Sequence, residues 1–188
     1  MAYIYYSNRT GVIYIGARSF FTLAPGMEPP INITVYTDGS CHTQLCTGAW
    51  VAIVLINNEK IIRTGTATDT THHRMEVTAV IEALQYIRQH ATAPAAIKVI
   101  TDSQFVAGLT GRRERLTGMG FQNKKGNTLR NADLIQEFLS LEAAMHPEIT
   151  KIKAHQQANA VTEYNIEADR LCRQLVRDMV GAGRLAGK

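Results

Sequence analysis

The sequence predicts an α/β fold, in which a mixed five-stranded sheet of three antiparallel strands and then parallel strands is flanked by helices. Three β-prone runs follow one another at 32–38, 48–57 and 60–68. The apolar residues then recur at helical spacing, and two later β-prone runs, at 97–101 and 149–153, are separated by helical segments. A strand that is reached through a helical crossover pairs in parallel with an earlier strand. We therefore expect the two later strands to extend the sheet in parallel.

Each predicted helix has its own signal in the sequence. The first begins near Arg74, and its apolar stripe consists of Met75, Ala79, Val80, Ala83, Leu84 and Ile87. Ser103 is a favourable N-cap for a short helix that reaches about Leu109. Two longer helices are expected at about 131–144 and 165–180, where apolar residues again recur every three or four positions.

A Pro/Gly cluster at 24–30 marks the clearest boundary in the chain, because it continues neither a helix nor a central strand. We therefore expect an N-terminal extension at 1–30 and the main domain at 31–188. Within the extension, β-prone runs at 3–6 and 12–15 flank a short polar segment and predict a hairpin. A lone hairpin is marginally stable in water, so we expect it to pack on the domain or on a second copy of the chain.

Composition limits the classes of function. The hydrophobic content of 45% and charged content of 19% are typical of a globular protein, and no apolar run approaches the length of a membrane span. A net charge of +4 favours a polyanionic partner if it is concentrated on one face. Three cysteines without disulfide-framework spacing indicate a reducing compartment, and we expect the cytoplasm.

Four acidic residues have the most informative positions. Asp38 and Asp102 each end a β-prone run with the pair Thr-Asp, whereas Glu76 and Asp169 lie near the starts of helices. A carboxylate at the end of a buried strand is costly to desolvate unless a cation compensates its charge. Divalent metal ions such as Mg²⁺ bind carboxylate oxygens, so these acids predict a metal site. The alternative is that the two aspartates on strands are turn or cap residues and the other two acids are solvated.

The segments around these acids resemble the ribonuclease H family, type I, and they occur in the order that the family shows. The matching segments are Tyr36–Cys41, Arg74–Glu76, Thr101–Val106, Arg130–Leu134, Lys153–His155, and Asn165 with Asp169. The resemblance implies a ribonuclease H-like sheet and two Mg²⁺ ions, with Mn²⁺ as an alternative. The ions would be held by Asp38, Glu76, Asp102 and Asp169, with Asp38 as the bridging ligand. The implied reaction is hydrolysis of the RNA strand of an RNA–DNA hybrid, which leaves 3′-hydroxyl and 5′-phosphate ends.

The same resemblance assigns further residues to the site. His155 lies on a polar loop and would carry protons or help to release a metal ion. Contacts to the RNA strand, including its 2′-hydroxyl groups, would come from residues near the acids: Gly39, Ser40, Cys41, His72, His73 and Asn165. His72 and His73 depart from the family, which usually has an asparagine pair there.

A basic segment at 112–130 would hold phosphates of the DNA strand, as a protrusion does in the bacterial family. The residues that we assign to this contact are Arg112, Arg113, Lys124 and Lys125. The alternative is a solvated charged face without a ligand.

Two other functions compete with hybrid cleavage. A nuclease with the same fold could act on another substrate, as transposase-like and junction-cutting enzymes do, although the Arg74–Glu76 and His155 contexts count against this. A non-catalytic hybrid-binding module would not need the intact set of four acids.

Overall fold

The structure, a computed structural model, describes residues 4–7, 12–15, 19–22, 31–56, 59–91, 96–153 and 162–186. The chain divides into two compact units, Met1–Ile31 and Asn32–Lys188. No helix within the described ranges is long and apolar enough to cross a membrane.

The first unit contains a three-stranded antiparallel sheet of β1 (Ile4–Ser7), β2 (Val12–Ile15) and β3 (Ser19–Thr22). β1 and β2 are antiparallel neighbours at the positions of the predicted hairpin. β3 was not predicted from the sequence. The predicted packing and self-association of this extension stay predictions.

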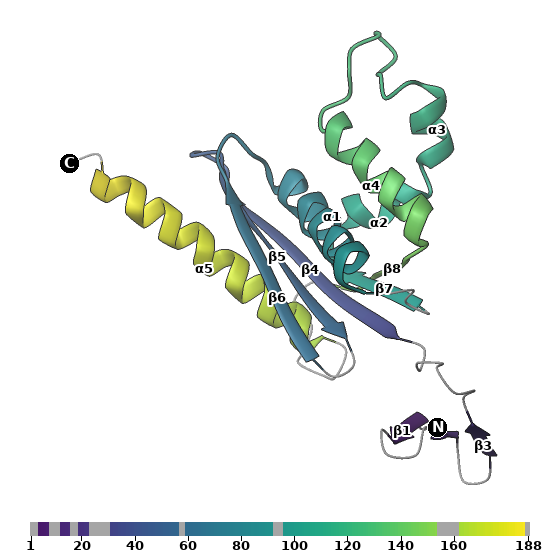
Figure 1. Ribbon diagram of the computed structural model, residues 1–188. Helices are drawn as coiled ribbons and strands as arrows, with labels where there is room; N and C mark the ends of the chain where they lie inside the picture. Colours follow the sequence, from purple (N-terminus) through teal and green to yellow (C-terminus); the bar gives the residue numbers. More distant parts are fainter. Residues whose placement is uncertain are drawn as a thin grey trace. The chain divides into compact units, whose positions relative to one another are not determined.

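The second unit is built on a mixed five-stranded sheet in the order β6-β5-β4-β7-β8 (Figure 1). The strands are β4 (Asn32–His42), β5 (Thr47–Ile56), β6 (Glu59–Ala67), β7 (Ala96–Thr101) and β8 (Glu148–Lys151). β4, β5 and β6 are antiparallel, β7 pairs in parallel with β4, and β8 pairs in parallel with β7. The predicted fold class is therefore confirmed.

Helices cover both faces of this sheet (Figure 1). α1 (His72–His90) packs on β4 and β5, with α4 (Ala132–Met145) behind it, and α5 (Glu163–Ala186) packs on the opposite face. Successive strand residues point to opposite faces, so the sheet serves two cores. The core under α5 is formed by Tyr36, Val51, Ile53, Ile100, Ala168 and Cys172. Val35 and Val99 alternate with these positions and are fully buried.

Two short helices fill the connection between β7 and α4. α2 (Gln104–Thr110) begins at the predicted cap, where the Ser103 hydroxyl accepts a hydrogen bond from the Val106 amide at 3.2 Å. α3 (Arg113–Gly118) was not predicted, because this basic segment buries only Leu116 and so lacks an apolar stripe.

Candidate active site

The pairing of β4 and β7 places Asp38 beside Asp102. The parallel ladder ends at Thr37 and Thr101, so each aspartate is the residue that directly follows the last paired position. The sequence predicted that Asp38 would end its strand, and this is wrong. β4 continues to His42, because β5 pairs with it from Asp38 opposite Val51 up to His42 opposite Thr47. Beyond Thr37, β4 therefore pairs with β5 but no longer with β7. The gap that this leaves between β4 and the end of β7 exposes the two aspartates to a cleft.

Gly39 allows α1 to approach this opening closely. A Cβ atom at Gly39 would lie 2.3 Å from the Glu76 amide nitrogen and 2.5 Å from the Met75 carbonyl carbon. Only glycine leaves room for the backbone of α1 at that distance. The first turns of α1 therefore rest on β4, and the nearly buried Glu76 faces the same cleft as Asp38.

Asp169 enters the cleft from α5, on the other face of the sheet. One turn further along α5, the buried Cys172 thiol donates a hydrogen bond to the Asp38 carbonyl oxygen at 3.2 Å and approaches the Ala49 carbonyl oxygen at 3.7 Å. Burial raises the pKa of this thiol, so it stays protonated and able to donate. Cys172 thereby fastens α5 to the backbone of Asp38, a role that the sequence did not reveal.

The cleft has a volume of about 380 Å³ and collects residues from β4, α1 and α5 and from the loop that follows β7. It is lined by Asp38, Gly39, Ser40, Cys41, His72, Glu76, Asp102, Asp169 and Arg173. Sequence analysis had assigned all of these except Arg173 to catalysis or substrate binding. Arg173 was missed because its only signal is its position, four residues after Asp169 on the same helix.

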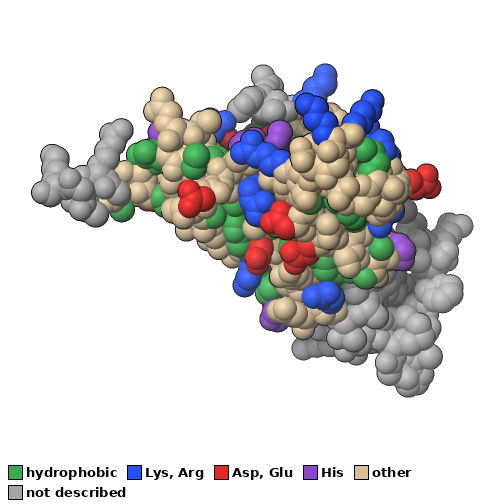
Figure 2. Space-filling view, turned by 90° about the horizontal axis from the view of Figure 1, so that it is seen from above, with side chains coloured by type: hydrophobic (Ala, Val, Ile, Leu, Met, Phe, Trp, Pro, Cys, Tyr) green, Lys and Arg blue, Asp and Glu red, His purple; other side chains and the backbone are tan. Residues whose placement is uncertain are grey.

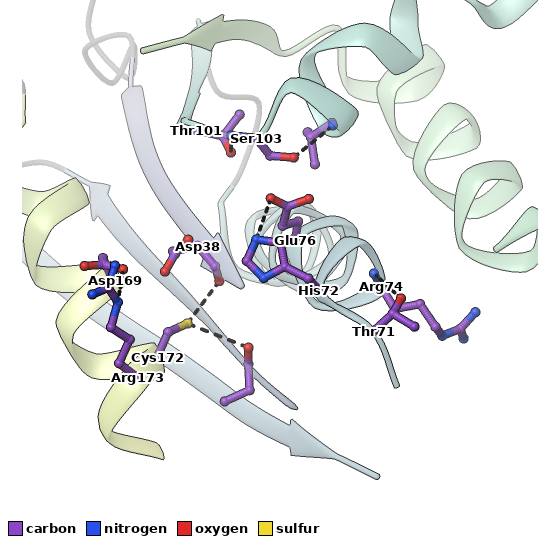
Figure 3. Close-up of polar contacts among 12 residues, drawn as sticks. Asp38, Thr71, His72, Arg74, Glu76, Thr101, Ser103, Asp169, Cys172 and Arg173 are labelled. Carbon is purple, nitrogen blue, oxygen red and sulfur yellow. Dashed lines mark hydrogen bonds and ion pairs between the residues drawn. The ribbon is translucent and has the colours of Figure 1, made fainter. Parts of the chain in front are cut away.

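Negative charge is concentrated in this cleft. Burial first, and then the neighbouring carboxylates of Asp102 and Asp169, raise the pKa of Asp38 from 3.8 to about 7. Two of the acids are paired with basic side chains from their own helices, as Figure 3 shows: Glu76 Oε1 lies 3.2 Å from His72 Nε2, and Asp169 Oδ1 lies 2.7 Å from Arg173 Nε. The other Glu76 oxygen, Oε2, is buried and has no hydrogen-bond partner.

These features fit a divalent metal ion. All four carboxylates are oxygen donors of the kind that Mg²⁺ and Mn²⁺ bind. An added cation would compensate both the burial of the Asp38 charge and its repulsion by Asp102 and Asp169, which together raise the pKa of Asp38. The unpartnered Glu76 Oε2 would gain a partner. As the side chains stand in the described residues, no three acidic, histidine or cysteine groups are arranged to hold an ion. Glu76 and Asp169 instead contact the basic side chains of His72 and Arg173.

The remaining predicted residues near the cleft have different surroundings. Ser40 and Cys41 follow Asp38 along β4 and line the cleft. His73 does not line it but stacks on Phe105, with ring centroids 4.6 Å apart, over a neighbouring hollow. Asn165 is buried in the first turn of α5, and its Oδ1 has no hydrogen-bond partner. His155 lies outside the described residues.

The four predicted basic residues fall into two groups. Arg112 donates to the carbonyl oxygens of Gly108 and Phe105 at 2.7 and 3.0 Å, and Arg113 donates to the Leu139 carbonyl oxygen at 2.9 Å and pairs with Glu142. Both guanidinium groups are therefore engaged in hydrogen bonds within the protein. Lys124 and Lys125 are exposed instead. Figure 2 shows acidic side chains gathered near the middle of the face seen from above, with Lys and Arg side chains beside them.

Comparison with known proteins decides the family. The family model described as RNase H matches residues 30–177. The chain is 36% identical over 152 residues to a ribonuclease H of Pelobacter propionicus, which covers 80% of this chain and 88% of that protein. It is 37% identical over 155 residues to a ribonuclease H of Anaplasma marginale, which covers 79% and 94%. The chain belongs to the ribonuclease H family.

Solved structures with low sequence identity show the same fold. LC9-RNase H1, described as a type 1 RNase H with the type 2 active-site motif, matches with a TM-score of 0.66 at 22% identity, over 81% of this chain and 75% of that one. The foamy viral protease-reverse transcriptase in complex with an RNA/DNA hybrid matches with a TM-score of 0.60 at 17% identity, over 84% of this chain and 22% of that one. The family match begins at residue 30, so it leaves β1–β3 outside.

Proposed function

We propose that the chain is an endonuclease that hydrolyses the RNA strand of RNA–DNA hybrids with two divalent metal ions and leaves 3′-hydroxyl and 5′-phosphate ends. The observation that carries the proposal is the convergence of Asp38, Glu76, Asp102 and Asp169 on one cleft, where burial and then the acidic neighbours raise the pKa of Asp38. The family membership supports it, since relatives above 30% identity are named ribonuclease H.

The chain's own residues would hold the metal ions and attract the phosphate backbone of the substrate. When bound, two Mg²⁺ or Mn²⁺ ions would activate a water molecule and neutralise the charge on the phosphate and the leaving oxygen. The buried Asp38 and Glu76 and the partly exposed Asp102 and Asp169 would hold the ions. Arg173 adds a positive charge to the cleft wall, where it can attract the phosphate backbone.

Three assignments stay predictions. His155 would carry a proton to the leaving oxygen. Ser40, Cys41 and His72 line the cleft and would contact the RNA strand, whose 2′-hydroxyl groups distinguish it from DNA. The third is the cytoplasmic location that the three free cysteines suggest.

The choice of substrate is tested by presenting the full chain with three duplexes of one sequence. We expect Mg²⁺-dependent cleavage of the RNA strand in the RNA–DNA hybrid, and little cleavage of double-stranded RNA or double-stranded DNA. Equal cleavage of the DNA duplex would favour the transposase-like alternative. Binding of the hybrid without cleavage of any duplex would favour a non-catalytic module.

The exposed lysines should contribute to hybrid affinity through phosphate contacts. Replacing Lys124 and Lys125 by alanine should reduce the slope of log K against log salt by up to about two, since each phosphate contact contributes about 0.9. The rate at saturating hybrid should change little, because neither lysine lines the cleft. Binding is measured by fluorescence anisotropy over a range of salt concentrations.

Arg113→Ala is the matched control for charge. It removes one positive charge from the same segment, but its guanidinium group is engaged with Leu139 and Glu142, so we expect a lower melting temperature and a nearly unchanged salt slope. If the lysine variant keeps the wild-type slope, the lysines form a solvated face and do not contact phosphates.

A further inference from the structure

His72 has an unusual place among the four carboxylates. It occupies the first position of α1, and Figure 3 shows its ring lying between Asp38 and Glu76. Its Nε2 lies 3.2 Å from Glu76 Oε1, and its ring interacts electrostatically with the carboxylates of Asp38 and Asp102. An imidazole nitrogen therefore faces the space that these acids share.

The separation between His72 Nε2 and Glu76 Oε1 suits two ligands of one metal ion. Ligand atoms that lie about 2.1 Å from an ion, at right angles to each other, are about 3 Å apart. The His72 side chain is 59% exposed, so little packing prevents the small ring movement that binding would require. Glu76 Oε2 has no hydrogen-bond partner, so this oxygen is available to bind a metal ion.

Imidazole changes which ion such a site prefers. Mg²⁺ and Ca²⁺ favour oxygen ligands, whereas first-row transition dications also bind neutral imidazole well. We propose that His72 is a nitrogen ligand of a metal ion in this cleft and gives the site a preference for first-row transition dications over Mg²⁺. The inference rests on the proposed metal-binding role of the carboxylates, and Mn²⁺ is the probe that tests it.

His73 offers a matched control next to His72. It is a histidine on the same turn of α1, but its ring stacks on Phe105 at 4.6 Å and lines the neighbouring hollow rather than the cleft. Replacing it by asparagine makes the same chemical change without removing a nitrogen from the acidic cleft.

The experiment measures binding of Mn²⁺ and of Mg²⁺ to the full chain by calorimetry, without nucleic acid and at alkaline pH, where imidazole is neutral. We expect His72→Asn to weaken Mn²⁺ binding at least about tenfold and Mg²⁺ binding by less than about twofold. His73→Asn should change neither affinity. Equal weakening of both ions by His72→Asn, or no weakening of Mn²⁺ binding, would overturn the proposal.

A spectroscopic measurement reports the ligand directly and does not depend on the affinity. Electron spin-echo spectra of the bound Mn²⁺ should show modulation from a directly coordinated nitrogen, which His72→Asn removes and His73→Asn leaves. Persistence of the nitrogen signal in His72→Asn would overturn the proposal. Both measurements are independent of hybrid cleavage, so a failure of the proposed function in the duplex assay would leave their result interpretable.

Discussion

Asp38→Asn should abolish hybrid cleavage and at the same time make the metal-free protein more stable. Asparagine keeps the shape of the side chain but removes the charge that would bind the metal ions. Loss of several kcal/mol of metal-assisted catalysis corresponds to a rate at least about 10³-fold lower. The stability should change in the opposite direction, because the charge of Asp38 is buried beside Asp102 and Asp169.

The stabilisation should depend on pH with a definite sign. The pKa of Asp38 rises from 3.8 to about 7 on folding, so the folded state binds the proton more tightly than the unfolded state does. This carboxyl group therefore lowers the stability of the wild type progressively as the pH rises from about 4 to about 7. In the presence of a chelator, the melting temperatures of wild type and Asp38→Asn should agree near pH 4 and diverge up to pH 8, by about 2–4 °C for each kcal/mol of relieved repulsion.

Asp178→Asn is the control for both measurements. Asp178 is an exposed acid of α5 that accepts a hydrogen bond from Gln174 at 2.7 Å and does not line the cleft. It should keep the wild-type rate and show no divergence with pH. Near wild-type cleavage by Asp38→Asn would remove this carboxylate from the metal site.

Gly39→Ala should have the second largest effect, because the added methyl group meets backbone atoms that cannot rotate away. Its Cβ would lie 2.3 Å from the Glu76 amide nitrogen, so α1 must move away from β4. We expect a loss of about 1–3 kcal/mol or more in the free energy of unfolding, as for other overpacked sites. The displacement of Glu76 from Asp38 should also lower the rate of cleavage by about 10²-fold, since small misplacements of catalytic groups have effects of that size.

The same substitution at Gly181 should act in the opposite direction. Gly181 lies within α5 with open space around it, so Gly181→Ala should raise the stability by about 0.5–1 kcal/mol through helix propensity. Thermal melts and cleavage rates of the two variants provide the comparison. Wild-type stability and activity in Gly39→Ala would show that the close approach of α1 is unnecessary.

The sequence predicted the positions of those acids that depend only on strand pairing and on helical periodicity. Asp38 and Asp102 each follow a threonine at the end of a β-prone run, and parallel pairing of the two runs brings such residues together. The helical period of α1 likewise places Glu76 near the helix start, beside the strand that the helix covers. Local pattern and pairing rules are sufficient for these positions.

Other features depend on contacts between distant segments, which a sequence pattern does not contain. The role of Cys172 as an anchor requires the Asp38 carbonyl, 134 residues away. Arg113 belongs to a basic run that predicts phosphate contacts, yet the Leu139 carbonyl oxygen on α4, 26 residues away, accepts its hydrogen bond. Charge counts do not distinguish such arginines from the free lysines of the same segment.

The products of hybrid cleavage test the central proposal most directly. An RNA–DNA hybrid with a labelled RNA strand is incubated with the full chain in Mg²⁺, in a chelator, and in a chelator followed by excess Mg²⁺, and the ends of the products are identified. Metal-assisted attack by water predicts 3′-hydroxyl and 5′-phosphate ends, complete loss of cleavage in the chelator, and recovery when Mg²⁺ is restored. Cleavage that persists in the chelator, or products with 2′,3′-cyclic phosphate ends from attack by the RNA's own 2′-hydroxyl group, would contradict the proposal.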